Sequence, residues 1–379
     1  MLVGRIGSGN LSAWFGLGVY NRRTVKQHHY SQHAIVLRAE LGRAVSREQM
    51  REFHKKSAVR HLAVTVRQFA ILGLATWGLI HFENPLIWVP LALVQGFTIF
   101  NFTVLLHEVV HHTVFRRPHQ RAERFLGLLY AVPSGISASQ FTRWHLDHHA
   151  ELGSDEDDPK RAHLSPKINA RWYKLLYCTP VLFPIYFRAA RRESSTYPVD
   201  LQRTIKWERQ LALFTHLTAL ASIWYFFGFY AALRTSIIPV FFIFPIAFTL
   251  NRLGQHYDID PDDTAKWGTL MKGHWFWDFA YLNSNYHLEH HYFPGVPFYR
   301  LPALQRALVP FYNEKQMRWQ SYGRLLYGWF IENRAPHTDW SKDGGSGRGF
   351  TTKVQDEGSH VGSHGGSHVG SHTGSHVGS

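Results

Sequence analysis

Four long apolar stretches dominate the chain and fall into two pairs. The first pair covers roughly residues 62–81 and 85–106, and the second covers roughly 211–233 and 236–254. Each stretch approaches the roughly 20 residues that an α-helix needs to cross a bilayer. The interruptions, at Glu83-Asn84-Pro85 and around Arg234-Thr235-Ser236, are too short to hold a domain. The pattern therefore predicts an all-α integral membrane protein with four transmembrane helices in two hairpins.

Two further apolar segments lie between the pairs. Residues 168–192 are rich in aromatic side chains, have basic flanks and contain Pro180 and Pro184. This favours a helix lying in the headgroup region over a fifth spanning helix. Residues 125–140 are short and contain Pro133 and Gly135, so we expect this segment to enter the membrane without crossing it.

The remaining segments complete the predicted organisation. Residues 1–61 form a basic N-terminal segment without a signal-peptide core, residues 62–310 a membrane domain, and residues 311–345 a C-terminal segment. Residues 346–379 form a tail in which Gly-Ser-His repeats with a period of four. Such a composition cannot bury a core, so the tail is expected to be disordered.

The distribution of charge predicts the orientation. Only 18% of the residues are charged, against about 25% in typical soluble domains. The net charge of +14 comes from Lys and Arg concentrated before, between and after the two apolar pairs. Positive charge marks the cytoplasmic side of a membrane. We therefore expect both termini and a polar helical cap to be cytoplasmic, and we interpret the basic excess as a topology signal rather than a nucleic-acid-binding surface.

Histidine is the predicted metal ligand. The chain has 26 histidines and one cysteine, which excludes a disulfide framework, a Cys-based zinc finger and a self-contained iron–sulfur centre. Three clusters stand beside the apolar pairs: HEVVHH at 107–112, HLDHH at 145–149 and HLEHH at 287–291. The spacing of the two HxxHH clusters places their imidazoles on one helical stripe. His256, just past the fourth apolar stretch, is a further candidate.

These histidines are too many for one tetrahedral zinc ion, so two metal ions are the simpler interpretation. Imidazole suits iron, copper and zinc alike. One alternative is an integral-membrane zinc peptidase in which His107 and His111 bind zinc and Glu108 is the general base, but it leaves both HxxHH clusters unused. A metal transporter or sensor is another alternative.

The three clusters resemble the histidine boxes of the membrane-bound fatty acid desaturase and hydroxylase superfamily. The order HxxxH or HxxxxH, HxxHH, HxxHH around two pairs of transmembrane helices is typical of that superfamily, and the resemblance covers roughly residues 60–310. Asp158-Pro159 after the second box, Asn285-Tyr286 before the third, and Tyr292-Phe293-Pro294 after it support the resemblance.

The resemblance implies a non-haem di-iron centre that activates molecular oxygen and abstracts hydrogen from an unactivated C–H bond. Its implied ligands are His107, His111, His145, His148, His149, His256, His287, His290 and His291. His112 fits the longer HxxxxH form, although helical phase favours His111, and Asn251 could hold a metal-bound water. The implied reaction is desaturation of an acyl chain or related lipid. The alternative is hydroxylation of a lipid, a carotenoid or a small polar metabolite.

Partners follow from what the sequence lacks. It has no Gly-rich dinucleotide motif, no haem motif of a fused cytochrome b5 domain and no cysteine pair. Electrons are therefore expected from a separate donor protein such as a ferredoxin, a rubredoxin or a cytochrome b5. Ligating histidines usually donate their second ring N–H to a carboxylate or carbonyl. The nearest carboxylates in sequence are Glu108, Asp147, Asp158 and Glu289.

Overall fold

The computed structural model describes residues 28–154, 157–166 and 168–334. Within these ranges the regular elements are helices and no β-strand is present, apart from isolated bridge positions such as that between Met271 and Gln320. The predicted repeat tail and residues 1–27 of the predicted basic N-terminal segment lie outside the described residues. The helices follow the order α2 (His29–His33), α3 (Ile35–Ala44), α4 (Arg47–Phe53), α5 (Ala58–His81), α6 (Pro85–Val110), α7 (Gln120–Ala131), α8 (Ala138–Glu151), α9 (Pro159–Leu164), α10 (Arg171–Leu176), α11 (Leu182–Ser194), α12 (Val199–Phe227), α13 (Phe229–Ala232), η2 (Leu233–Ile243), α14 (Phe244–His256), α15 (Trp275–Ala280), α16 (His287–Tyr292), α17 (Leu301–Glu314) and α18 (Tyr322–Leu326).

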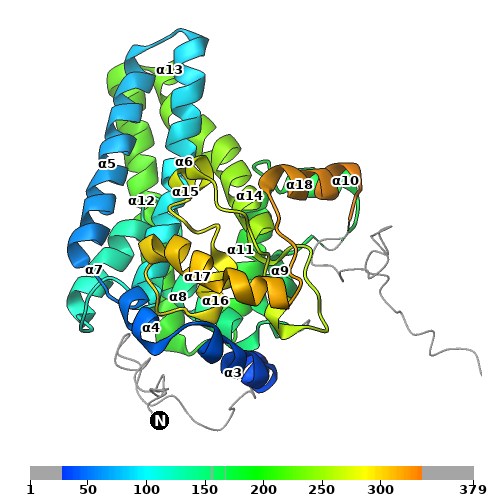
Figure 1. Ribbon diagram of the computed structural model, residues 1–379. Helices are drawn as coiled ribbons and strands as arrows, with labels where there is room; N and C mark the ends of the chain where they lie inside the picture. Colours follow the sequence, from blue (N-terminus) through cyan, green and yellow to red (C-terminus); the bar gives the residue numbers. More distant parts are fainter. Residues whose placement is uncertain (1–27, 155–156, 167, 335–379) are drawn as a thin grey trace, which may run out of the picture.

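Four helical segments are long and apolar enough to cross a membrane, as predicted. They are α5, α6, α12 and the continuous run α13–η2–α14. In Figure 1 the long helices extend side by side toward one end of the molecule, and the shorter helices α3, α4, α8, α9, α16 and α17 gather at the other end. This division separates the apolar half of the molecule from the half that carries the histidines.

The turn of the first pair forms where the sequence predicts it. The Asn84 side chain accepts a hydrogen bond from the Leu86 N–H at 2.9 Å, and Pro85 occupies the first helical position of α6. Both are favoured helix-start signals, since Asn satisfies a free N–H and Pro has none to satisfy. As a result only three residues separate α5 from α6, and the two helices pack along each other.

The predicted turn of the second pair is wrong in position. The helix α12 ends at Phe227, and Gly228 makes the break with φ +85°, a conformation that glycine adopts at little cost. Residues 234–236 lie inside the π-helical segment η2, which also contains Pro239. Proline has no N–H for the regular helical ladder, which accounts for a local departure from α-geometry. The Arg234 guanidinium donates to the Phe82 carbonyl at 3.0 Å, next to the first turn.

Each of the two shorter apolar segments contains a turn between two helices. Residues 168–192 form two helices, α10 and most of α11, separated by a turn at Thr179-Pro180. Residues 125–140 hold the end of α7, a turn with Gly135 at φ +68°, and the start of α8. The turn directs α8, which carries the second histidine box, back against α6 and α7.

One buried core joins the two ends of the described chain. It contains Leu37 and Leu41 of α3, Phe102 of α6, Tyr312 of α17 and Trp329 near the C-terminal end of the described residues. The helix α17 packs against α3, α4 and α16, and thereby fixes the third histidine box from behind.

Candidate metal centre

The structure gathers all nine predicted ligand histidines into two groups. In each group the candidate ligand atoms lie within 4.8 Å of one another. The first group is His107, His111, His145, His149 and His290; the second is His148, His256, His287 and His291.

The end of α6 decides between His111 and His112. The helix ends at Val110, His111 caps it, and His112 adopts φ +54°. This left-handed residue turns its ring to Glu123, with Nδ1 3.2 Å from the carboxylate. His111 instead faces the first group, so the HxxxH spacing is the one that brings two rings together.

Each HxxHH box serves both groups from one face of its helix. In α8, His145 and His149 face the first group and His148 the second; in α16, His287 and His291 face the second and His290 the first. Seen down the helix axis, the fourth residue after the first is rotated by about 40° from it. The third residue after the first is rotated by about 60° in the opposite sense. One box therefore divides its rings between two adjacent centres.

The ring nitrogens have the spacing of metal ligands. The Nε2 atoms of His111 and His145 are 2.7 Å apart, and those of His149 and His290 are 3.0 Å apart. In the second group, His256 Nε2 lies 3.0 Å from that of His148 and 3.1 Å from that of His287. Nitrogens about 2.1 Å from one metal ion lie about 3 Å apart when they subtend a right angle. The Nε2 of His107 is buried without a hydrogen-bond partner, as a free ligand atom would be.

Two of the candidate ligands are oriented by hydrogen bonds from Nδ1, the ring nitrogen that does not face the histidine group. His148 Nδ1 donates to Asp158 Oδ1 at 2.8 Å, and His256 Nδ1 donates to the Trp267 carbonyl at 2.9 Å. A proton on Nδ1 leaves the Nε2 lone pair of each ring facing its group. Asp158 also caps α9 by accepting from the backbone N–H of Lys160 at 2.9 Å.

Burial keeps the seven candidate ligand histidines that lie outside the spanning helices neutral. It lowers the pKa values well below the ordinary range for His111, His145, His148, His149, His287, His290 and His291, and neighbouring histidines lower most of them further. A neutral imidazole is the form that binds a metal ion. Both groups are therefore set up to accept metal at neutral pH.

The other predicted carboxylates have different partners. Glu108 accepts hydrogen bonds from the Phe298 N–H at 3.1 Å and from Thr113, and lies 3.4 Å from His107 Nδ1. Asp147 pairs with Arg143 at 2.7 Å. The peptidase alternative requires Glu108 as a general base, but its carboxylate is engaged in packing α6 against the segment after the third box.

Glu289 supports α16 from within the core. It accepts from Tyr312 at 2.7 Å and from Gln305 at 2.8 Å. Burial raises the pKa of Glu289 to about 7. Its partners are both on α17, so this carboxyl group fixes the third box to the helix behind it.

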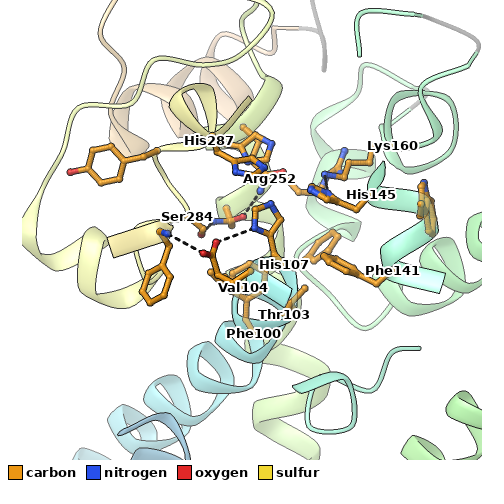
Figure 2. A pocket seen from close by; sticks show the side chains of 18 of the residues that line it. Phe100, Thr103, Val104, His107, Phe141, His145, Lys160, Arg252, Ser284 and His287 are labelled. Atoms are coloured by element: carbon orange, nitrogen blue, oxygen red, sulfur yellow. Dashed lines mark hydrogen bonds and ion pairs between the residues drawn. The ribbon is translucent and has the colours of Figure 1, made fainter. Parts of the chain in front are cut away.

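A cavity opens onto both histidine groups (Figure 2). His107, His145 and His290 of the first group and His287 of the second line one part of it. The apolar part is formed mainly by Phe100, Phe141, Trp144, Leu164, Tyr186 and Phe248. An apolar cavity that ends at convergent polar groups is the usual form of a small-molecule site, and this one suits an alkyl chain.

Comparison with known proteins decides the family. A family model described as fatty acid desaturase matches residues 83–323, more than half of the chain. The chain belongs to the fatty acid desaturase family. The match spans α6 through the start of α18 and includes all three histidine boxes.

Relatives in the desaturase family act on sphingolipids. The human sphingolipid delta(4)-desaturase/C4-monooxygenase is 25% identical over 247 residues, which cover 62% of this chain and 69% of the relative. The human sphingolipid delta(4)-desaturase is 24% identical with the same coverage, and that of Xenopus tropicalis is 25% identical over 247 residues. The chain is thus an oxidoreductase of the desaturase and hydroxylase superfamily.

Three residues at this desaturase-family site were missed by the sequence reasoning. The Trp267 carbonyl comes from a loop and carries no side-chain signal. Lys160 directly follows Asp158-Pro159, and its Nζ lies 3.4 Å from His145 Nδ1. Arg252 lines the cavity from α14, and its signal was available, because a cation inside an apolar stretch usually has a function.

Proposed function

We propose that the nine histidines hold two iron ions, one in each group, and that the chain uses them with molecular oxygen to desaturate or hydroxylate a lipid. The observation that carries the proposal is the convergence of nine ring nitrogens in two adjacent all-imidazole groups at the end of an apolar cavity. Membership in the desaturase family supports iron over copper and zinc, which imidazole would also bind.

Iron bound there would supply the redox chemistry that removes hydrogen from an unactivated C–H bond. In desaturation, the substrate loses two hydrogens, and oxygen takes up these with two electrons and two protons to give two waters. In hydroxylation, the substrate gains one oxygen atom and one water forms. Both need two electrons from an external donor, for which a ferredoxin, a rubredoxin or a cytochrome b5 is the proposed type.

The chain's own residues hold the reacting groups in place. Asp158 and the Trp267 carbonyl fix the rings of His148 and His256, and the aromatic side chains of the cavity would bind the alkyl chain and exclude water. Asn251 donates to Ser284 Oγ at 2.7 Å and accepts from Gln255 at 2.7 Å. This network forms part of the cavity wall and would hold a water beside the metals.

The substrate is proposed to be a long-chain lipid oxidised near its head. The names of the relatives place their reactions at carbon 4 of a sphingolipid, both as desaturation and as monooxygenation. The same pair of outcomes is expected here, since both begin with one hydrogen abstraction.

The membrane arrangement is also a proposal. The helices α5–α6 and α12–α14 form two spanning hairpins, and the short helices with the boxes form a cytoplasmic cap. Large exposed apolar side chains on α12, including Leu213, Phe214, Leu217 and Trp224, support contact with lipid. In the most apolar 18-residue stretch of α12, only 6% of the residues are buried within the protein.

The first experiment compares lipids and bound iron. Cells that express the wild type or His290→Ala are analysed by mass spectrometry of total lipids, and the purified proteins by metal analysis. The wild type should give a lipid two mass units lighter or sixteen heavier, and bind about two irons. His290→Ala should lose the product and at least half of the iron.

The matched control is His112→Asn. Asn tolerates the positive φ of this position and can donate to Glu123, so product and iron should stay at the wild-type level. Loss of iron in the control but not in His290→Ala would contradict the proposed ligand set. Full iron with no lipid product would contradict the proposed substrate.

A further inference from the structure

The cavity beside the histidine groups carries two cations. Lys160, from the first turn of α9, and Arg252, from α14, both line it. Figure 2 shows them at the histidine end, with Lys160 beside His145 and Arg252 in view between His145 and His287. Both side chains are partly buried. Burying like charges together is costly unless something of opposite charge compensates them.

Two described carboxylates near these cations are engaged with other partners, although Asp158 also attracts both cations electrostatically. Glu108 lines the cavity, but it accepts from Thr113 and from the Phe298 N–H. Asp158 Oδ1 accepts from His148 and from the N–H of Lys160. Within the described ranges, neither Lys160 nor Arg252 has a carboxylate within salt-bridge distance.

The contact of Lys160 with His145 does not satisfy the ammonium group. The Nε2 of His145 faces the first group, 2.7 Å from that of His111. When Nε2 binds metal, the ring proton resides on Nδ1, and an N–H cannot accept from the ammonium group 3.4 Å away. Lys160 then has no hydrogen-bond acceptor for its ammonium group among the residues that the structure describes.

Arg252 lines the same cavity from α14. It stands four residues before His256, inside the fourth apolar segment, and its guanidinium lies 5.9 Å from the centre of the Phe248 ring. It has no hydrogen-bond acceptor among the residues that the structure describes, and a second, smaller cavity adjoins it. A permanently charged guanidinium with free donors suits a carboxylate or a phosphate.

We infer that Lys160 and Arg252 form a binding site for an anionic head group of the substrate, either a carboxylate or a phosphate. The inference rests on the proposed function and narrows its substrate class. The alkyl chain extends from this site along Phe100, Phe141 and Phe248. Because Lys160 touches a ligand histidine, the oxidised carbon lies within the first few carbons from the head.

The proposed site is tested with three ligands that share a twelve-carbon chain and differ only in the head group. The purified full-length protein, in a neutral detergent and without an electron donor, is titrated with dodecanoate, dodecyl phosphate and dodecanol in a calorimeter. At least one anion should bind about tenfold or more tightly than the alcohol. Preference for dodecanoate identifies a carboxylate head, and preference for dodecyl phosphate a phosphate head. Equal affinity for all three would overturn the inference.

Substitutions that remove the charge of Lys160 or Arg252 test whether these residues act through their charge or through packing. Arg252→Gln and Lys160→Met should each lower the affinity for the preferred anion about tenfold and leave that for dodecanol within about twofold. Arg203→Gln, at an exposed position on α12, is the matched control and should leave both unchanged. Equal losses for anion and alcohol would overturn the inference, since they would indicate a purely structural role.

Two further readouts keep the test decisive. Arg252→Lys retains a charge and should keep part of the anion preference, even if Arg252→Gln does not give a monodisperse protein. Binding needs neither oxygen nor turnover. Loss of anion preference with intact lipid oxidation would refute only this inference, whereas absent iron with retained anion preference would refute only the proposed function.

Discussion

Asp158 performs two tasks with one carboxylate. It caps α9 through the backbone N–H of Lys160, and it accepts from Nδ1 of His148, which lies in the second histidine group. The cap makes the position of the carboxylate independent of the metal. The ring of His148 is therefore oriented before any ion binds, which lowers the entropic cost of binding.

Asp158→Asn is expected to weaken metal binding without unfolding α9. Asn is as good a helix cap as Asp, so the helix start should persist. The amide is a weaker acceptor than the carboxylate, and affinity for metal should fall about 10–100-fold. Competition with a chelator measures the change, and circular dichroism checks the fold. Unchanged affinity would show that the Asp158 charge does not act on His148.

At this scale the sequence predicted which histidines converge better than it predicted their surroundings. The spacing of the boxes brought eight of the nine histidines to attention, and the family resemblance added His256 to the implied set. Helical phase favoured His111 over His112, and the structure turns the His112 ring away through a left-handed backbone at the helix end. The sequence could not indicate the Trp267 carbonyl, because any residue offers the same backbone acceptor.

Among the elements, α6 and η2 approach each other closely at Gly96. A Cβ added at Gly96 would overlap the Ile243 side chain and lie 3.0 Å from the Pro239 carbonyl oxygen. Small residues allow such approaches between helices in membranes. The crossing matters for the site, because α6 carries His107 and the run from η2 into α14 carries His256.

Gly96→Ala is expected to destabilise the protein by about 1–3 kcal/mol, because the backbones must separate to admit the methyl group. Gly73→Ala is the matched control. Gly73 also lies within a long apolar helix, and nothing lies within 4 Å of its added Cβ, so the better helix propensity of Ala should leave stability equal or higher. Thermal unfolding in detergent measures both. A larger loss at Gly73 would contradict the packing described here.

The same elements show the limit of hydropathy as a guide. Four apolar runs predicted four long helices, because length and apolarity are summed over many residues. The break in the second pair was placed at Arg234–Ser236, where polar residues interrupt the run. The structure instead breaks at Gly228, because the backbone needs a positive φ there, and Arg234 stays helical by reaching the Phe82 carbonyl.

For the whole molecule, the proposed orientation can be tested with one reactive thiol. The chain has a single cysteine, Cys178, so Cys178→Ser gives a thiol-free background. Glu83→Cys then places a thiol in the α5–α6 turn and Glu52→Cys one on α4, both at exposed positions. An impermeant maleimide should label the first in intact cells and the second only after permeabilisation. The reverse pattern would invert the topology.

The two histidine groups are built from shared parts. The helices α8 and α16 each place rings in both groups, while α6 serves only the first and α14 only the second. Occupying one group would thus order most of the scaffold of the other, which lowers the remaining conformational cost for the second ion. We therefore expect the two metal ions to bind with positive cooperativity. When metal is limiting, most molecules would then hold either no ion or two ions. A centre with a single, oxygen-reactive ion would rarely be exposed to the cell.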